Sequence, residues 1–179
     1  VEVTHHELED HRLINSDVLA PRQHDGLIVA PFGYVQYSNA RLEMDVTGQL
    51  PLIERDLLIV QGDAHIAGTL EITVADLKDL PSNEYVLMVA DRIHGDFDEI
   101  IINSPNARRI TTCMTEHNIT VHIGDFQVRD TTRTLTPSLI IEMINTFGGT
   151  DHHWDMNDDG HVDATDLGIL LSNGSMCTH

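Results

Sequence analysis

Basic and aromatic residues are scarce in this chain, and their scarcity limits what it can do. Aromatic residues make up 4% of the 179 residues, and lysine occurs once, as Lys78. There are 29 Asp and Glu residues against 10 Lys and Arg, so the formal net charge is −19. So acidic a surface repels nucleic-acid phosphates and anionic membranes and favours divalent cations. The core must be aliphatic, and no apolar run is long enough to span a membrane.

The motifs of common enzyme classes and of thiolate metal sites are also missing. Neither cysteine, Cys113 nor Cys177, belongs to a CxxC pair, which argues against zinc binding by thiolates and against thioredoxin-like redox chemistry. The sequence leaves open whether the two form a disulfide, as an exported protein allows, or stay free thiols. No GxSxG, P-loop or GxGxxG motif occurs, and we expect no enzymatic activity.

Twelve histidines are present, but none has the spacing of a metal-binding motif such as HExxH or HxH. His5–His6 and His152–His153 are adjacent pairs, and adjacent residues on a strand point to opposite faces. This pattern favours surface histidines in an acidic protein. A copper or zinc site assembled from histidines far apart in the sequence remains the alternative.

Short apolar runs separated by turn residues fill residues 27–129. Leu42, Met44 and Val46 alternate with charged residues, which is the period of a half-buried strand. Further strands are predicted within 26–38, 56–62, 64–77, 85–93, 98–105, 118–124 and 125–130. The predicted architecture is mainly β, as a β-solenoid end or a β-sandwich, and the sequence does not separate these two. Residues 1–26 are polar and are predicted to be an extended arm that pairs with a sheet edge of this chain or of a neighbour.

The apolar period changes after Pro137. The helix predicted there carries apolar side chains at helical spacing: Leu139, Ile140, Met143, Ile144 and Phe147. Thr136 or Ser138 is expected to cap its start, and a second helix is predicted around 167–171. Residues 130–179 are therefore expected to form a small α-helical unit appended to the β domain.

Between the two helices, residues 155–166 have the spacing of a calcium-binding loop. Such a loop supplies oxygen ligands from positions 1, 3, 5, 7, 9 and 12, with glycine at position 6. The chain has suitable residues at all these positions: Asp155, Asn157, Asp159, His161 (through its backbone carbonyl), Asp163 and Asp166, with Gly160 at the sixth. Val162, at position 8, is the apolar residue expected to pin the loop to the core. We predict one bound Ca²⁺, and the alternative is a solvated acidic turn.

This unit runs from loop to helix, because the residues GGTDHHW separate the preceding helix from Asp155. The segment DMNDDGHVDATDLGILLSN resembles dockerin modules, whose loops read DxNxDGxxxxxDLxxLL, and in particular the dockerin-like tails of planctomycete-type exported proteins. Dockerins normally carry two such halves. A shift of 27 residues aligns 135–148 with 162–175 and keeps the apolar pattern, but the residues at loop positions 1, 3, 5 and 12 become Val128, Asp130, Thr132 and Leu139. The resemblance therefore implies one intact loop and one decayed copy.

The β region carries a second resemblance. Residues 56–74, DLLIVQGDAHIAGTLEITV, and 85–97, YVLMVADRIHGDF, are similar to a recurrent module of autotransporter-like and planctomycete exported β-solenoid proteins. The resemblance implies an extracellular or cell-surface location and a structural role, and it brings no catalytic residues.

These observations lead to one predicted function and two alternatives. We expect a non-catalytic exported structural protein, stabilised by calcium, that self-assembles into an extracellular filament, sheath or surface layer by strand addition of the arm 1–26. The first alternative is a dockerin-like adaptor that anchors the β domain to another surface protein. The second is a carbohydrate-active β-solenoid enzyme.

Overall fold

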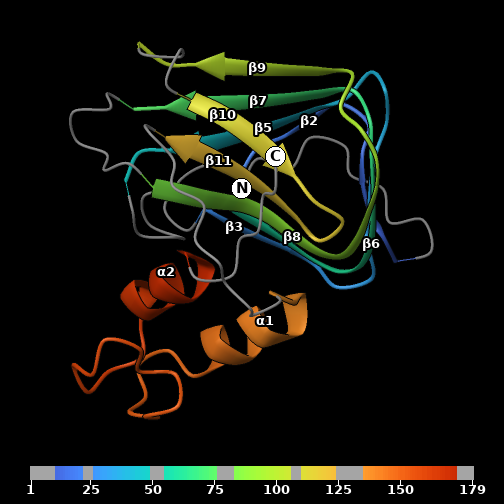
Figure 1. Cartoon of the computed structure of the whole chain (residues 1–179). Helices are drawn as coiled ribbons and strands as arrows, with labels where there is room; N and C mark the ends of the chain where they lie inside the picture. The colour runs from blue at the N-terminus through green and yellow to red at the C-terminus, as the bar shows by residue number, and fades with distance from the viewer. Residues whose placement is uncertain are drawn as a thin grey trace.

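The computed structural model describes residues 11–21, 26–48, 55–75, 83–105, 110–123 and 135–172. Within these residues the chain forms two β-sheets and two α-helices, which are arranged in three layers (Figure 1). The mainly β class predicted from the short alternating runs is therefore confirmed. Neither described helix has the length and apolar character needed to cross a membrane.

The larger sheet has seven strands in the order β1–β4–β6–β8–β11–β10, and β3 also pairs with β6. Every pairing among β1, β3, β4, β6 and β8 is parallel, whereas β11 pairs antiparallel with both β8 and β10. The bounds are β1 Leu13–Asn15, β3 Leu27–Ala30, β4 Tyr34–Gln36, β6 Leu57–Ile66, β8 Asn83–Gly95, β10 Ile110–Met114 and β11 Asn118–Ile123.

The smaller sheet has four strands in the order β2–β5–β7–β9, all parallel. They are β2 Val18–Leu19, β5 Arg41–Val46, β7 Thr69–Val74 and β9 Glu99–Asn103. From β4 to β9, strands of the two sheets alternate along the chain, so that β6 leads into β7 and β8 leads into β9. Each pass therefore adds one parallel strand to each sheet. The in-register pairs Leu27–Leu57 and Leu58–Met88 are both 30 residues apart in the sequence.

Aliphatic side chains fill the space between the two sheets, as the scarcity of aromatic residues requires. The alternation predicted for β5 is observed, because Leu42, Met44 and Val46 are buried while Arg41 and Asp45 are exposed. Strand β7 contributes in the same way with Leu70, Ile72 and Val74.

A polar cluster is also buried near the beginning of this core. Asn15 and Gln36 lie in register on β1 and β4, and the hydroxyl of Tyr34 donates to Oε1 of Gln36 at 2.7 Å. The side-chain amide of Gln36 donates to the backbone carbonyl of Ala67 at 2.7 Å and to that of Thr69 at 3.1 Å. Gln36 thereby ties the larger sheet to the turn that enters β7, and burial raises the pKa of Tyr34.

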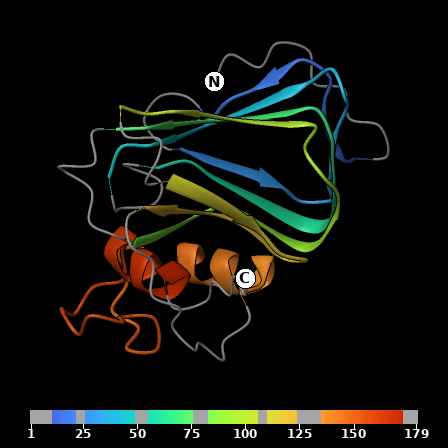
Figure 2. The ribbon, with the colours of Figure 1, turned by 45° about the horizontal axis from the view of Figure 1, so that its top comes forward.

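Helices α1 (Pro137–Asn145) and α2 (Ala164–Ser172) cover the outer face of the larger sheet (Figure 2). In β6, Leu58 faces the smaller sheet, whereas Leu57 and Ile59 face the helices. A strand buried on both faces needs a continuous apolar run, which β6 has at its start. The helix predicted after Pro137 is confirmed, and the hydroxyl of Thr136 caps it by accepting from the N–H of Leu139 at 3.3 Å.

Two predicted features lie outside the described residues, and one observed strand was not predicted. The strand predicted at 125–130 and the boundary at 129/130 lie outside the described residues. Strand β10 was not predicted, because its threonine-rich sequence lacks a clear apolar alternation. Within the predicted arm 1–26, the described strands β1 and β2 pair with β4 and β5 of this same chain.

Candidate functional site

The predicted calcium loop joins the end of the α1 region to the start of α2. Gly160 has a φ of 90°, a left-handed value that glycine adopts without strain and that the sharp turn at position 6 requires. The N–H of Gly148 donates to the carbonyl of Val162 at 2.9 Å, and the N–H of Val162 donates to the carbonyl of Gly149 at 3.0 Å. These two backbone hydrogen bonds fix the middle of the loop against the residues that follow α1.

Two of the predicted ligands are buried and hold the loop backbone. Asp155 is 5% exposed; its Oδ1 accepts from the N–H of Asp159 at 3.1 Å, and its Oδ2 accepts from that of Gly160 at 2.8 Å. Asp166 is 0% exposed, and its Oδ1 accepts from the N–H of Met156 at 2.8 Å. Its Oδ2 accepts from the N–H of Asp163 at 2.9 Å. The first and last ligand positions therefore pin opposite sides of the same loop.

The other four predicted ligand residues, Asn157, Asp159, His161 and Asp163, are exposed. The side-chain amide of Asn157 donates to Oδ2 of Asp159 at 2.9 Å, and this hydrogen bond lowers the pKa of Asp159. The N–H of His161 donates to Oδ1 of Asp159 at 2.9 Å, and Oδ1 of Asp163 accepts from the N–H of Thr165 at 2.7 Å. These contacts give each oxygen-bearing side chain a fixed place along the loop.

The carboxylates of the loop are engaged with backbone N–H groups and do not gather around one point. Across the described ranges, the one group of three His, Cys, Asp or Glu side chains whose ligand atoms all lie within 4.8 Å of one another is elsewhere. A calcium ion would therefore draw the carboxylate oxygens inward from these backbone partners. The residue types fit calcium, since carboxylate, amide and carbonyl oxygens are its preferred ligands.

The loop is coupled to the helices and the larger sheet through two buried side chains. Val162, at loop position 8, is 0% exposed and Trp154, just before the loop, is 4% exposed. Both belong to the apolar cluster between the helices and the larger sheet, where Leu57, Ile59, Val86 and Val89 are the strand residues. Trp154 is therefore a packing residue of this cluster. A change in the conformation of the loop is therefore expected to alter the packing of the core beneath it.

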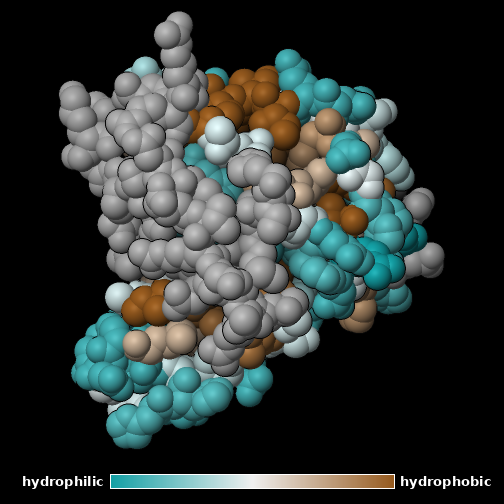
Figure 3. All heavy atoms as spheres, viewed as in Figure 1, coloured by the Kyte–Doolittle hydropathy of each residue, from teal (hydrophilic) through white to brown (hydrophobic). Residues whose placement is uncertain are grey.

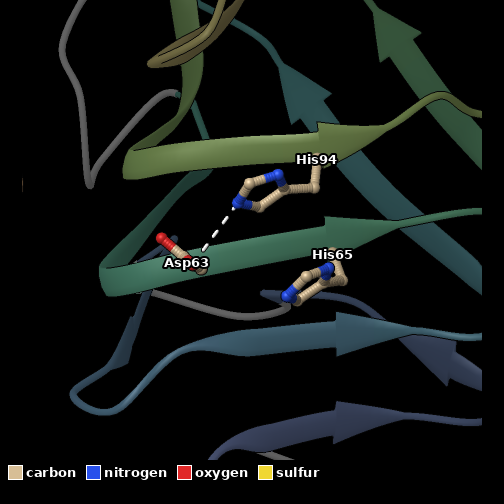
Figure 4. Close-up of side chains that lie close together, drawn as sticks. All are labelled: Asp63, His65 and His94. Atoms are coloured by element: carbon tan, nitrogen blue, oxygen red, sulfur yellow. Dashed lines mark ion pairs between the residues drawn. The ribbon is translucent and has the colours of Figure 1, made fainter.

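The group that does gather lies on the opposite part of β6 and was not found from the sequence. Asp63 and His65 project from β6, and His94 projects from β8 (Figure 4). Nε2 of His94 lies 3.3 Å from Oδ2 of Asp63, and the rings of His65 and His94 stack with centroids 4.8 Å apart. The sequence signal was Asp63-Ala64-His65, in which residues two apart share a strand face. The third member, His94, could be placed beside them only from the register between β6 and β8, which no local sequence pattern gives.

A backbone bend in β6 brings these side chains to the surface. Gly62 has a φ of 115° and the β6–β8 register shifts between Val60 and Asp63. Beyond the bend, Ala64 and Ile66 face the core between the sheets, so Asp63 and His65 face outward. Before the bend this side of β6 is covered by the helices, and beyond the bend it is exposed to solvent.

Cys113, on β10, is disulfide-bonded, which favours the disulfide over the free thiols among the two possibilities that the sequence allowed. Cys177, the other cysteine of the chain, lies outside the described residues. Of the predicted surface histidines, His152 and His153 are exposed, whereas His122 is buried beside Glu84. The pair His5–His6 lies outside the described part of the chain.

Comparison of the chain with family models, with curated proteins and with solved structures finds no match in any of the three.

Proposed function

We propose that this chain is a non-catalytic structural module of an exported protein, stabilised by one calcium ion and able to self-assemble. The observation that carries the proposal is the position of the predicted loop. Its first and last ligands, Asp155 and Asp166, are buried, and its residue Val162 packs into the core beneath the helices. An ion held there stabilises the seam between the helices and the larger sheet.

We infer that the β region is a short β-solenoid. Successive strands from β4 to β9 alternate between the two sheets, and every pairing among β2, β5, β7 and β9 is parallel. A sandwich of hairpins would give antiparallel neighbours, because a short turn reverses the chain. Parallel strands joined by short connections, repeating at about 30 residues, are instead the winding of a solenoid coil. This reading agrees with the resemblance of 56–74 and 85–97 to exported solenoid proteins.

The two helices support the view that the C-terminal unit is a degenerate pair of loop-helix halves. Helix α1 begins at Pro137 and α2 at Ala164, and both have nine residues, so they keep the offset of 27 residues seen in the sequence. Thr136 caps α1, and Asp163 holds the equivalent place before α2, where it accepts from the N–H of Thr165. One half retains a full set of calcium ligands, and the other retains only its helix.

Calcium would act through folding linkage. It binds the native loop and not the unfolded chain, so the free energy of unfolding rises as RT ln(1 + [Ca]/Kd). In an extracellular setting, where calcium is plentiful, the module would be held folded. In a calcium-poor compartment it would be less stable, so the protein would reach its full stability only after export.

Self-assembly is supported by the β9 end of the smaller sheet. Within the described residues β9 pairs only with β7, so one edge of β9 is unpaired. Ile100 stands in register with the buried Leu70 on the core-facing side, yet it is 45% exposed. Figure 3 shows hydrophobic side chains gathered at the top of the view, where β9 lies. An edge strand with exposed apolar residues is a template for another strand, and a second copy offers β2 at the other end of its sheet.

The adaptor alternative receives less support from the same observations. In a docking module the helices present a surface to a partner, but here the buried side chains of α1 and α2, such as Met143 and Leu170, pack on the larger sheet of this chain. The buried faces of the helices therefore form a layer of this chain's own fold and are not available to a partner.

Light scattering across a range of protein concentrations tests the assembly step. In calcium, the particle size of the unaltered chain is expected to grow with concentration, whereas Ile100→Lys, which places a charge on the unpaired edge, should remain monomeric. Val29→Lys is the matched control, since Val29 is 42% exposed on β3, away from this edge, and it should assemble normally. If the unaltered chain stays monomeric at high concentration with calcium, self-assembly is withdrawn.

A further inference from the structure

We propose that Asp63, His65 and His94 form a second metal site, for a first-row transition-metal ion, and that zinc is the ion it fits best. The site lies on the outer face of the larger sheet and shares no residue with the calcium loop. Two imidazoles and one carboxylate are a common zinc ligand set, with water in the fourth position.

The register of two parallel strands builds the site. Asp63 and His65 are two residues apart on β6 and so share a face, and His94 is the in-register partner of His65 on β8. Parallel neighbours lie about 4.8 Å apart, which brings side chains of adjacent strands within reach of one ion. The ligand atoms of all three residues already lie within 4.8 Å of one another.

The distances are close to those that a tetrahedral ion requires. Ligand atoms about 2.0–2.1 Å from zinc lie about 3.4 Å from each other at the tetrahedral angle. Nε2 of His94 and Oδ2 of Asp63 are 3.3 Å apart. The two imidazole rings are 15° from parallel, so they must tilt toward each other to aim both nitrogens at one point. Both side chains are at least partly exposed, and rotation of a surface imidazole meets little resistance.

The charges around the group favour a cation. Arg92 is the in-register partner of Asp63, but its Nη2 lies 2.7 Å from Oε1 of Glu116 and is paired there. Among the described residues, the ion pair of the Asp63 carboxylate is with His94, and an ion bound between the two would take its place. The net charge of −19 further lowers the electrostatic cost of binding a divalent cation.

The chemistry of the donors separates this site from the loop. The loop offers only oxygen atoms, which suit the hard calcium ion, whereas two imidazole nitrogens suit zinc, copper or nickel and bind calcium poorly. Zinc is proposed because its tetrahedral preference accepts three protein ligands and one water on a surface site. The two sites are thus expected to fill independently.

Isothermal titration with zinc chloride, on the full chain in saturating calcium, tests the proposal. The unaltered chain is expected to show a zinc-binding event that His65→Ala and His94→Ala each weaken at least tenfold, because each removes one of three ligands. His152→Ala is the control, since His152 is an exposed histidine away from the group, and it should bind zinc like the unaltered chain. A loss of less than tenfold in either triad variant, or an equal loss in the control, overturns the proposal.

Two further measurements exclude trivial explanations. The three side chains are partly or fully exposed, so each variant should unfold at the same temperature as the unaltered chain when no zinc is present. Asp63→Asn keeps the shape of the carboxylate and removes its charge, and it should also weaken zinc binding. Co²⁺ bound in place of zinc should give the visible absorption of a tetrahedral site, and octahedral absorption from solvated Co²⁺ alone would contradict the assignment.

Discussion

The N–H of Met156 donates to Oδ1 of Asp166 at 2.8 Å, so the first turn of α2 holds the start of the loop that precedes it. The other oxygen of the same carboxylate accepts from the N–H of Asp163. Asp166 thereby closes the loop in the structure and is also the last predicted calcium ligand. Its side chain is one methylene shorter than the glutamate usual at this position. This shorter length is consistent with its direct hydrogen bonds to the backbone of the loop.

Removing the charge of Asp155 is expected to weaken calcium binding at least 100-fold. Asp155→Asn leaves the shape of the buried side chain intact but replaces a charged ligand at position 1 by a neutral one. Calorimetric titration measures the change. Asp158→Asn is a matched control with the same change in charge, because Asp158 is exposed, lies between ligand positions and has a φ of 59° that asparagine tolerates. Equal losses in the two variants would mean that only the overall charge matters.

Chelation of calcium is expected to lower the thermal stability. At a calcium concentration 100 times Kd, linkage contributes about 2.7 kcal/mol to the free energy of unfolding. For a chain of this size, that corresponds to a fall in Tm of about 5–10 °C. Trp154, buried beside the loop, is the only tryptophan and reports the transition by fluorescence. A Tm that is the same in calcium and in chelator would contradict the linkage.

Truncation of Leu170 is expected to destabilise the whole module. Leu170 is fully buried among the helices and the larger sheet, and Leu→Ala at such a site costs about 2–5 kcal/mol. Because the helices and the sheet share this core, denaturant should unfold both in one transition, followed by circular dichroism and by Trp154 fluorescence. Glu142→Ala, an exposed change on α1, should leave the midpoint almost unchanged. Separate transitions for helices and strands would show that the helical unit folds independently.

Replacement of Gln36 by leucine is expected to destabilise the β region although it adds apolar surface to the core. Gln36→Leu leaves the carbonyls of Ala67 and Thr69 and the hydroxyl of Tyr34 without this partner. Each buried polar group left unsatisfied costs about 1–3 kcal/mol. Urea denaturation measures the loss, and Asn39→Ala, which removes an exposed amide, is the control. A Gln36→Leu variant as stable as the unaltered chain would mean that water replaces the amide.

Local patterns in the sequence predicted most of the elements. The alternation of Leu42, Met44 and Val46 and the helical spacing of Ile140 and Met143 were sufficient, because each records which face of one element is buried. The order of strands in the sheets was not predictable in this way. Parallel pairing of strands places residues about 30 positions apart side by side, and no single strand carries that information.

The Asp63–His65–His94 group shows the same limit most clearly. A search for HxH or HExxH examines neighbours along the chain, whereas His65 and His94 meet across two parallel strands. A calcium loop could be proposed from the sequence because all of its expected ligand positions lie within one stretch of twelve residues. The burial of Asp155 and Asp166, by contrast, follows from the packing of the helices on the sheet and had no signal in the sequence.

The most direct test of the account is a calorimetric titration of the full chain with calcium, with light scattering followed in the same samples. The account predicts one calcium ion per chain and, as the loop fills, particles that grow with protein concentration. One bound ion without any increase in particle size would indicate a calcium-stabilised monomer and would contradict self-assembly. No binding of calcium would contradict the central claim, because the loop from Asp155 to Asp166 would then be only a hydrogen-bonded turn.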